Sequence, residues 1–374
     1  MKYSLVALAC LSACLDSKEP VDPEPTSKRT ISISTGVAPL LVAYREGTSG
    51  DWLAATKVSD AAYEARVGGA YSVMVVCAET VQITSWTLED ALMVKGYCAV
   101  PATPLTVTGT MKQPGRVTLG AATTASVNED WTFTLKVPAG AADLVAVSTD
   151  RIYVQRSLAI SSNLTLPAID LSTQGTALVD AAFTATNPRA GEVLSAATLL
   201  VSPRLDPQAQ IYRGAMTAVK VVPSSLLGGD LVQEVSLRAQ LLAGARQSMR
   251  TSRRPFRVGD DTSVTFWDPL PGHAFLIDQG RATLSWASRA ELDTLSLSVS
   301  ASNGWSYSVS ASKNYLTDTK LTKLAIDLEA PGFLASWRPN LGAEYQMSLF
   351  AQRLTPLVES YSAEDTFNVG ALAQ

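Results

Sequence analysis

The chain has 374 residues, 47% of them hydrophobic and only 17% charged, which is enough apolar material for the cores of two to four domains. Its net charge of −4 argues against general affinity for nucleic acid and against polybasic docking to acidic lipid. Beyond the N-terminal region, no run approaches the 18 apolar residues that would suggest a membrane-spanning helix.

The first residues have the pattern of a secretory signal. Lys2 precedes the apolar run "YSLVALACLSA", which at eleven residues is too short to cross a bilayer, since a spanning helix needs about 20. The run ends in "LSAC", residues 11–14, and this ending resembles the lipobox of bacterial lipoproteins. The resemblance implies that residues 1–13 are a signal peptide, that cleavage falls between Ala13 and Cys14, and that Cys14 carries the acyl chains. The alternative is an ordinary cleaved signal that leaves Cys14 as a free thiol.

Residues 14–29 are rich in Pro, Asp, Glu, Lys and Ser, and this composition predicts a disordered, extended tether. Several acyl chains on Cys14 would give durable membrane anchoring. In well-studied Gram-negative bacteria, Asp directly after the lipidated Cys retains a lipoprotein in the inner membrane, and here that position is Leu15. The resemblance therefore implies the outer membrane, with the folded part on its periplasmic or cell-surface side.

Two cysteines remain once Cys10 is removed and Cys14 is lipidated. In an oxidising compartment, Cys77 and Cys98 are predicted to form a disulfide. It would close a loop of about 20 residues and stabilise the fold by roughly 3 kcal/mol. The alternatives are buried thiols or a metal site, but a metal site needs about four ligands and His273 is the only histidine. We expect no metal and no cofactor.

Alternation of apolar and polar residues predicts an all-β fold built from tandem β-sandwich modules. The segments "DWTFTLKV" and "LSLSVSASNGWSYSVS" alternate clearly. The second contains Asn303-Gly304, a pair typical of a type I′ hairpin turn, and its polar face is almost all serine, which suggests a solvated sheet face. The exception is "TLEDALMV" (87–94), where a possible Thr87 cap predicts one short helix.

Composition and turn signals divide the mature chain into four predicted modules. They are residues 30–101 with the disulfide and short helix, 103–185, 186–258 and 262–374. The second module resembles the small transthyretin-like or carboxypeptidase-regulatory-like sandwiches, in which an aromatic strand runs through a Pro-Gly turn ("VPAG") into an apolar strand. That resemblance implies a stabilising or binding accessory and names no reaction.

Catalytic motifs are missing from the sequence. There is no G-x-S-x-G elbow near His273, no H-E-x-x-H, no P-loop and no calcium loop. A carboxylate pair of glycosidase type cannot be assigned from spacing, because such pairs meet only in the fold. We therefore predict no catalytic residue. Of the seven tryptophans, Trp131, Trp286 and Trp305 lie on apolar strand faces, and the other four have irregular neighbours that leave exposure open.

The run "ARQSMRTSRRPFR" is the one candidate binding site. Five arginines could grip an anionic polymer: Arg246, Arg250, Arg253, Arg254 and Arg257. The alternative is a strand and loop with arginines on a wet face. In a strand, Arg250 and Arg254 share one face, and Arg253 and Arg257 share the other.

These observations predict a non-enzymatic cell-envelope lipoprotein that binds, scaffolds or adheres. The alternatives are an envelope hydrolase that uses carboxylates and a passive surface spacer. The expected partners are the membrane, through the N-terminal lipid, and an envelope polysaccharide or protein, but not nucleic acid. The oligomeric state is left open.

Overall fold

The structure is a computed structural model that describes residues 28–96, 98, 104–120, 122–124, 132–243, 246–267, 273–278, 281–287, 292–301, 304–339, 345–353 and 358–367. Strands account for 59% of it and helices for 7%, which confirms the predicted all-β fold class. The two α-helices are α1 (Leu171–Gln174) and α2 (Lys313–Thr319). Three 3-10 turns complete the helical part: η1 (Met216–Ala218), η2 (Ser224–Leu226) and η3 (Ala335–Trp337). The predicted signal peptide, Ala13 and Cys14 lie outside the described residues, as does most of the tether.

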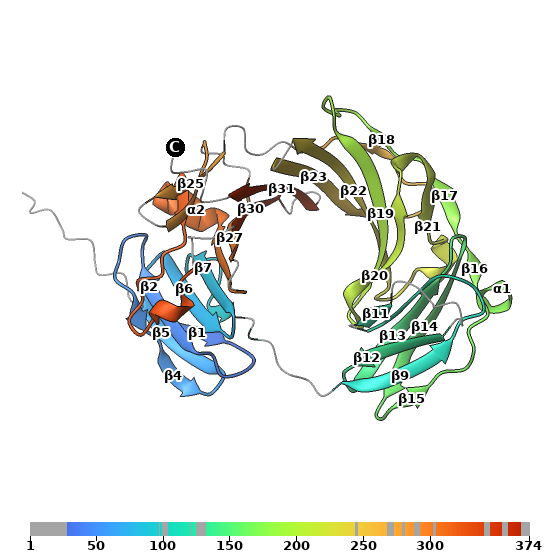
Figure 1. The fold of residues 1–374 in the computed structure, drawn as a ribbon, viewed down its shortest axis with the longest axis horizontal. Coiled ribbons are helices and arrows are strands. Elements are labelled where there is room, and N and C mark those ends of the chain that lie inside the picture. Colours follow the sequence, from blue (N-terminus) through green and yellow to red (C-terminus); the bar gives the residue numbers. More distant parts are fainter. Residues whose placement is uncertain are drawn as a thin grey trace, which may run out of the picture.

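A twelve-stranded sheet joins the two halves of the molecule (Figure 1). In spatial order its strands are β20 (Leu205–Gly214), β19 (Val193–Ser202), β22 (Val232–Ala243), β23 (Arg246–Pro255), β31 (Val358–Phe367), β30 (Tyr345–Arg353), β27 (Thr294–Ala301), β28 (Ser306–Ser312), β7 (Thr80–Trp86), β6 (Tyr71–Cys77), β2 (Leu41–Glu46) and β3 (Leu53–Ala54). Neighbouring strands are antiparallel except β28 and β7, which pair in parallel.

This sheet crosses the predicted module boundaries. Its strands come from the first, third and fourth predicted modules. Two pairings join them: Val309 of β28 lies opposite Ile83 of β7, and Arg250 of β23 lies opposite Tyr361 of β31. Three predicted modules thus share one sheet, where the sequence suggested separate sandwiches in tandem. The physical reason is that alternation identifies a strand, whereas sheet edges join through backbone groups that every sequence carries.

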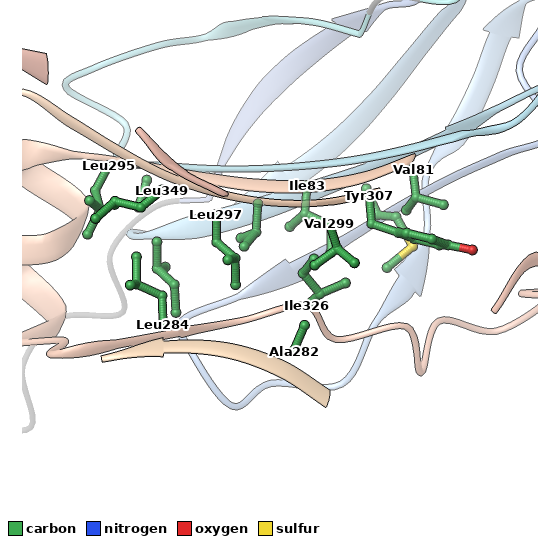
Figure 2. Packing of buried hydrophobic residues seen from close by; sticks show 14 of the residues in the cluster. Val81, Ile83, Ala282, Leu284, Leu295, Leu297, Val299, Tyr307, Ile326 and Leu349 are labelled. Carbon is green, nitrogen blue, oxygen red and sulfur yellow. The ribbon is translucent and has the colours of Figure 1, made fainter. Parts of the chain in front are cut away.

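One face of the large sheet, here called the closed face, is covered by hydrophobic cores. In the C-terminal half, Leu295, Leu297 and Val299 pack against Leu284 and Ile326, as Figure 2 shows. Opposite them lies a three-stranded sheet made of β25 (Ala274–Asp278), β26 (Arg281–Ser285) and β29 (Lys323–Ala325).

A second core on the closed face lies under β19 and β22 and includes Val235, Leu237 and Phe266. Four short strands cover it: β17 (Val179–Ala181) with β21 (Val219–Val221), and β18 (Thr184–Ala185) with β24 (Ser263–Val264). β17 and β18 fall at the end of the predicted second module, but they pair with strands of later residues. In Figure 1 these strands lie on the outer side of an arch, so the opposite, open face is turned inward.

The N-terminal half adds a four-stranded sheet of β4 (Thr56–Ser59), β5 (Ala62–Val67), β1 (Arg29–Ser34) and β8 (Met93–Lys95). It packs on β6 through a core that contains Ile31, Val67 and Tyr71. The predicted disulfide between Cys77 and Cys98 is confirmed, with their Cα atoms 5.3 Å apart. Since Arg29 already begins β1, the predicted tether is too long by at least one residue at its folded end.

The predicted helix over residues 87–94 is wrong beyond a single turn. The Thr87 backbone N–H and hydroxyl both donate to an Asp90 carboxylate oxygen at 3.0 Å, as the capping pattern suggested. The chain then enters β8, where Val94 lies beside Ile33 of β1 and is buried. Parallel pairing and burial of Val94 outweigh the weak intrinsic helix preference of this stretch.

A separate sandwich lies between residues 105 and 177. Its five-stranded sheet contains β11 (Ala122–Thr124), β10 (Arg116–Leu119), β13 (Gly140–Val147), β14 (Arg151–Ile160) and β16 (Thr176–Ala177), and its three-stranded sheet contains β12 (Thr132–Val137), β9 (Leu105–Thr110) and β15 (Leu164–Thr165). Phe133, Leu135 and Leu144 are buried in its core. The alternation of "TFTLKV" therefore predicted β12 and its buried face correctly.

The predicted hairpin between β27 and β28 is confirmed, with Val299 opposite Tyr307. Asn303 of the predicted type I′ turn lies outside the described residues. The Gly304 N–H donates to the Ala301 carbonyl oxygen. Gly304 has a φ of 84°, in the left-handed region that glycine adopts without strain.

Candidate functional site

The open face of the large sheet carries a regular set of serines on β27, β28 and β30. Cross-strand partners are Ser296 with Ser310, Ser298 with Ser308, and Ser300 with Ser306, while Ser348 lies opposite Ser298 on the other side. All seven are half-buried or exposed. This is the face that the sequence predicted to be solvated. We call it the serine array: Ser296, Ser298, Ser300, Ser306, Ser308, Ser310 and Ser348.

The array continues onto β7 because β7 pairs in parallel with β28. Thr80, Gln82 and Thr84 lie opposite its serines. Neighbouring strands are about 4.8 Å apart, and residues two apart on one strand are separated by about 6.7 Å. The hydroxyls therefore form a two-dimensional lattice. Each hydroxyl can donate and accept a hydrogen bond. Most cross-strand neighbours of the array are Ser, Thr and Gln, while Phe350 lies opposite Ser296 and Glu364 lies opposite Ser348. Groups that can exchange hydrogen bonds therefore predominate on this part of the face.

At the other end of the same face, β20 and β22 carry two arginines, Arg213 and Arg238, here called the open-face arginines. Ala197 of β19 lies between their strands, opposite Arg213 on one side and Ser236 on the other. Arg238 follows Ser236 by two residues and therefore points to the same face. Ala197 and Ser236 are small and buried, at 2% and 3% exposure, so the floor between the two arginines is low.

Arg238 is held without a counter-charge. Its side chain is half-buried, and its Nε has no hydrogen-bond partner although that atom is fully buried. Burial lowers the pKa of its guanidinium, and the nearby charge of Arg213 lowers it further. The carboxylate that β22 carries on this face, Glu234, is bound by Arg253. The two cations therefore repel each other, and among the described side chains no anion lies between them.

A third arginine reaches this end of the face from the separate sandwich. Arg116 of β10 donates from Nη1 to the side-chain oxygen of Gln210 at 2.8 Å. Gln210 lies on β20 opposite Leu199 of β19. Leu199 is two residues from Ala197, the partner of Arg213, so Gln210 lies on the same face as Arg213. No ion pair to a carboxylate accompanies Arg116 in the described part of the chain. All three side chains are therefore cationic groups without anionic partners, and the sequence analysis missed all of them because they are far apart in the chain.

The predicted anion-binding arginines whose side chains are described do not form one patch. Arg254 lies on the closed face, where its carbon Cζ is 6.0 Å from the Phe183 ring centre and its Nη2 donates to the Asp261 carbonyl oxygen. Arg253 lies on the open face with Glu234. Arg257 is exposed in the loop after β23. Arg246 is the first residue of β23, and the structure describes its backbone alone. Arg250 and Arg254 therefore share one face of β23 and Arg253 lies on the other, as predicted, whereas Arg257 lies beyond the end of the strand.

Arg250, in the middle of the same arginine run, is not available to a ligand, because it belongs to the closed-face core. It is 2% exposed and donates from Nε and Nη2 to the two carboxylate oxygens of Glu192, at 2.9 and 2.5 Å. Burial would raise the pKa of Glu192, but the hydrogen bonds and charge of Arg250 outweigh it and lower that pKa. This is a structural ion pair.

Another buried carboxylate, Asp143, joins the separate sandwich to the large sheet. A bulge in β13 falls at this residue, which is fully buried and accepts hydrogen bonds from Ser202 Oγ (2.7 Å), Arg156 Nε (2.9 Å) and the Ser157 N–H (2.8 Å). Arg156 also pairs with Asp230. The network connects β13 and β14 with β19, so it fixes one structural unit against the next.

The residues that could suggest catalysis or aromatic stacking fall in ordinary structural places. The ring of His273 lies edge-on to Phe275 at 5.8 Å between centres. Trp52, Trp267 and Trp286 are buried, Trp86, Trp305 and Trp337 are half-buried, and Trp131 lies outside the described residues. No strip of exposed tryptophans therefore exists in the described ranges, although Phe350 on the open face is 42% exposed.

Two cavities lie away from the open face. One of about 330 Å³ lies in the separate sandwich between Tyr153, Leu158, Leu164 and Ile169 and is mainly apolar. The other, of about 100 Å³, has an apolar base that includes Tyr307, and the bidentate ion pair of Arg338 with Glu329 forms part of its rim.

Within the ranges that the structure describes, no three His, Cys, Asp or Glu side chains are grouped as metal ligands. The same ranges contain no helix with the length and apolar character needed to cross a membrane. No protein-family model matches the chain, and no curated protein is significantly similar to it.

Proposed function

We propose that the protein is a non-enzymatic cell-envelope lipoprotein that holds a polyhydroxylated envelope polymer on the open face of its large sheet. The observation that carries this proposal is the serine array and its extension onto β7, which present a repeating lattice of hydroxyl and amide groups. A polysaccharide offers hydroxyls at regular intervals, and each can exchange hydrogen bonds with such a lattice.

The architecture supports a rigid binding surface. The array takes residues from strands more than 200 residues apart in sequence, held in register by the parallel pair β28 and β7. Ser312, the N-cap of α2, and Asn314 both bond the Asp90 carboxylate, at 2.5 and 2.7 Å, and so reinforce the same junction. A preorganised surface loses less conformational freedom on binding, which favours affinity for a repetitive ligand.

The carboxylates support binding over hydrolysis. A glycosidase acid needs a raised pKa so that it is protonated at neutral pH. Where the pKa of a described carboxyl is shifted, it is lowered, by ion pairs or hydrogen bonds, as at Glu192, Asp230 and Asp261. These carboxyls are suited to pairing with cations and not to donating a proton.

The anchoring part of the proposal is supported by the lipobox-like "LSAC" at residues 11–14. Strand β1 begins at Arg29, so the segment from Cys14 to that strand could extend on the order of 45 Å. Such a length would let the arch stand off a membrane surface. The outer membrane is the proposed location, since Leu15 and not Asp follows the lipidated Cys.

The binding surface is tested by blocking it. Co-sedimentation of the Cys14→Ser chain with insoluble envelope polysaccharide should show binding, and Ser298→Tyr, which places a bulky ring at the centre of the array, should reduce it by about tenfold or more. Ser59→Tyr on the exposed strand β4 is the matched control and should bind normally. Equal binding by both variants would rule out the serine array as the surface.

The anchor is tested separately. Metabolic acyl labelling and membrane fractionation should place the full chain in the outer membrane with label, and the Cys14→Ser chain in the soluble fraction without it. Protease treatment of intact cells then distinguishes the cell-surface side from the periplasmic side. An unlabelled, soluble full chain would reject the lipoprotein assignment while leaving the binding surface to its own test.

A further inference from the structure

We infer that the polymer carries negative charge, and that Arg213 and Arg238, with Arg116 beside them, bind its phosphate or carboxylate groups. This inference rests on the proposed function and specifies its ligand. It goes beyond the arginine run that the sequence suggested, because these residues come from β10, β20 and β22.

The first argument is the missing counter-charge. Several other half-buried arginines meet a carboxylate: Arg45 meets Asp327, Arg156 meets Asp143, and Arg253 meets Glu234. Arg151 and Arg254 instead donate to backbone carbonyl oxygens. Arg238 is half-buried and its neighbour Arg213 is exposed, and neither has a hydrogen bond or ion pair within the described ranges. A desolvated cation beside a second cation is unfavourable alone, and an anion bound between them would remove both penalties.

The second argument is geometric. Arg213 and Arg238 come from strands separated only by β19, so their backbones are about 10 Å apart across the sheet. Ala197 and Ser236 keep the surface between them low. Two arginine side chains can lean toward a group seated there, and the planar guanidinium matches the two oxygens of a carboxylate or phosphate.

The third argument is continuity. The open-face arginines and the serine array lie on the same face of one sheet, since cross-strand partners share a face from β20 to β7. A polymer lying across the strands would meet hydroxyl-bearing residues at one end and cations at the other. An acidic polysaccharide offers both hydroxyls and anionic groups along one chain.

Three forms of one backbone test this inference: dextran, carboxymethyl dextran and phosphorylated dextran. Binding to the Cys14→Ser chain would be measured by titration at low and high salt. Both charged dextrans should bind more tightly than neutral dextran, and salt should remove the difference. The variant Arg213→Gln/Arg238→Gln should lose roughly tenfold or more in affinity for the charged forms, and none for the neutral one.

A matched control removes the same charge elsewhere. Arg66 and Arg257 are exposed, so Arg66→Gln/Arg257→Gln should bind charged dextran like the parent chain. A loss confined to the control would contradict the inference and place the anion site at Arg66 or Arg257 instead. The preferred charged form tells phosphate from carboxylate.

The two proposals fail in different ways. If neutral and charged dextrans bind alike and the Arg213→Gln/Arg238→Gln variant is unaffected, the anion site is wrong and the polymer-binding face stands. If the charged dextrans bind and the Arg variant abolishes this while Ser298→Tyr does not, the anion site stands without the serine array. Unchanged circular dichroism and thermal unfolding of each variant show that the fold is intact, because neither open-face arginine supports a core.

Discussion

The arginines on the two faces of β22 and β23 differ in whether a carboxylate pairs with them. On the closed face, Arg250 is buried and its charge is matched by Glu192. On the open face, Arg238 occupies the position next to Ala239, the partner of Arg250, and has no matching carboxylate. The closed-face arginine therefore contributes to the fold, whereas its neighbour on the open face carries an unsatisfied charge that the fold does not need. A counter-charge, and not burial alone, distinguishes the arginine that pairs within the fold from the one that we propose binds an anion.

The largest change in stability is expected when the closed-face carboxylate is removed. Glu192→Gln leaves Arg250 as a buried charge without an anion, so we expect the free energy of unfolding to fall by about 3–5 kcal/mol. Urea unfolding followed by tryptophan fluorescence measures this. Glu89→Gln, at an exposed turn position, should change it by less than about 0.5 kcal/mol. Equal losses in the two variants would contradict the structural role of the buried pair.

Acid should remove part of the same stabilisation. Because Arg250 lowers the pKa of Glu192 in the folded state, its contribution is full above the ordinary Glu pKa of about 4.3 and is lost as pH falls toward the lowered value. The stability gap between the parent chain and Glu192→Gln should therefore narrow below about pH 4.3. Unfolding midpoints between neutral and acidic pH measure the gap, and a gap that widens with acid would have the wrong sign.

A smaller effect is expected at the junction with the separate sandwich. Asp143→Asn keeps an acceptor for Ser202 but weakens the charge-assisted bond to Arg156, so we expect a loss of about 1–3 kcal/mol. Asp150→Asn, at an exposed turn, serves as the control. Differential scanning calorimetry tests whether the sandwich then unfolds before the large sheet. Unchanged unfolding would mean that Asp143 does not hold the two units together.

The smallest effect is expected at Arg238. Arg238→Met removes an unmatched charge and keeps the apolar stem, so stability should stay within about 0.5 kcal/mol or increase. Arg250→Met, one strand away, should instead cost several kcal/mol because it leaves Glu192 unpaired. The same urea measurement compares the two. A loss at Arg238 as large as that at Arg250 would remove the distinction between the faces.

Local pattern predicted much of the fold. Alternation identified β12, β27 and β28 with their buried faces, and cysteine count identified the disulfide. The helix wrongly predicted for residues 87–94 shows where local pattern fails, because pairing of Val94 with β1 overrides a local N-cap. The shared sheet shows another, since nothing in the sequence of β7 indicates that its edge partner is β28.

The candidate site was harder to predict for the same reason. The arginine run after residue 245 was conspicuous because its members are close in sequence, yet alternation distributes them over both faces of β23. Arg116, Arg213 and Arg238 are spread over more than 120 residues. Pairing of β20 and β22 with β19 brings Arg213 and Arg238 together, and Arg116 reaches the same end of the sheet from β10 through Gln210. A cluster assembled by tertiary pairing leaves no local signal.

The parallel pairing of β28 with β7 also bears on how the chain folds. Ile83 cannot meet Val309 until more than 220 further residues have been made, so synthesis from the N-terminus leaves the β7 edge without its neighbour for most of that time. Contacts this distant in sequence slow folding, and an unpaired edge invites association with other chains. The last third of the chain therefore protects the first third, and truncation after residue 260 should yield an aggregating product rather than a shorter soluble one.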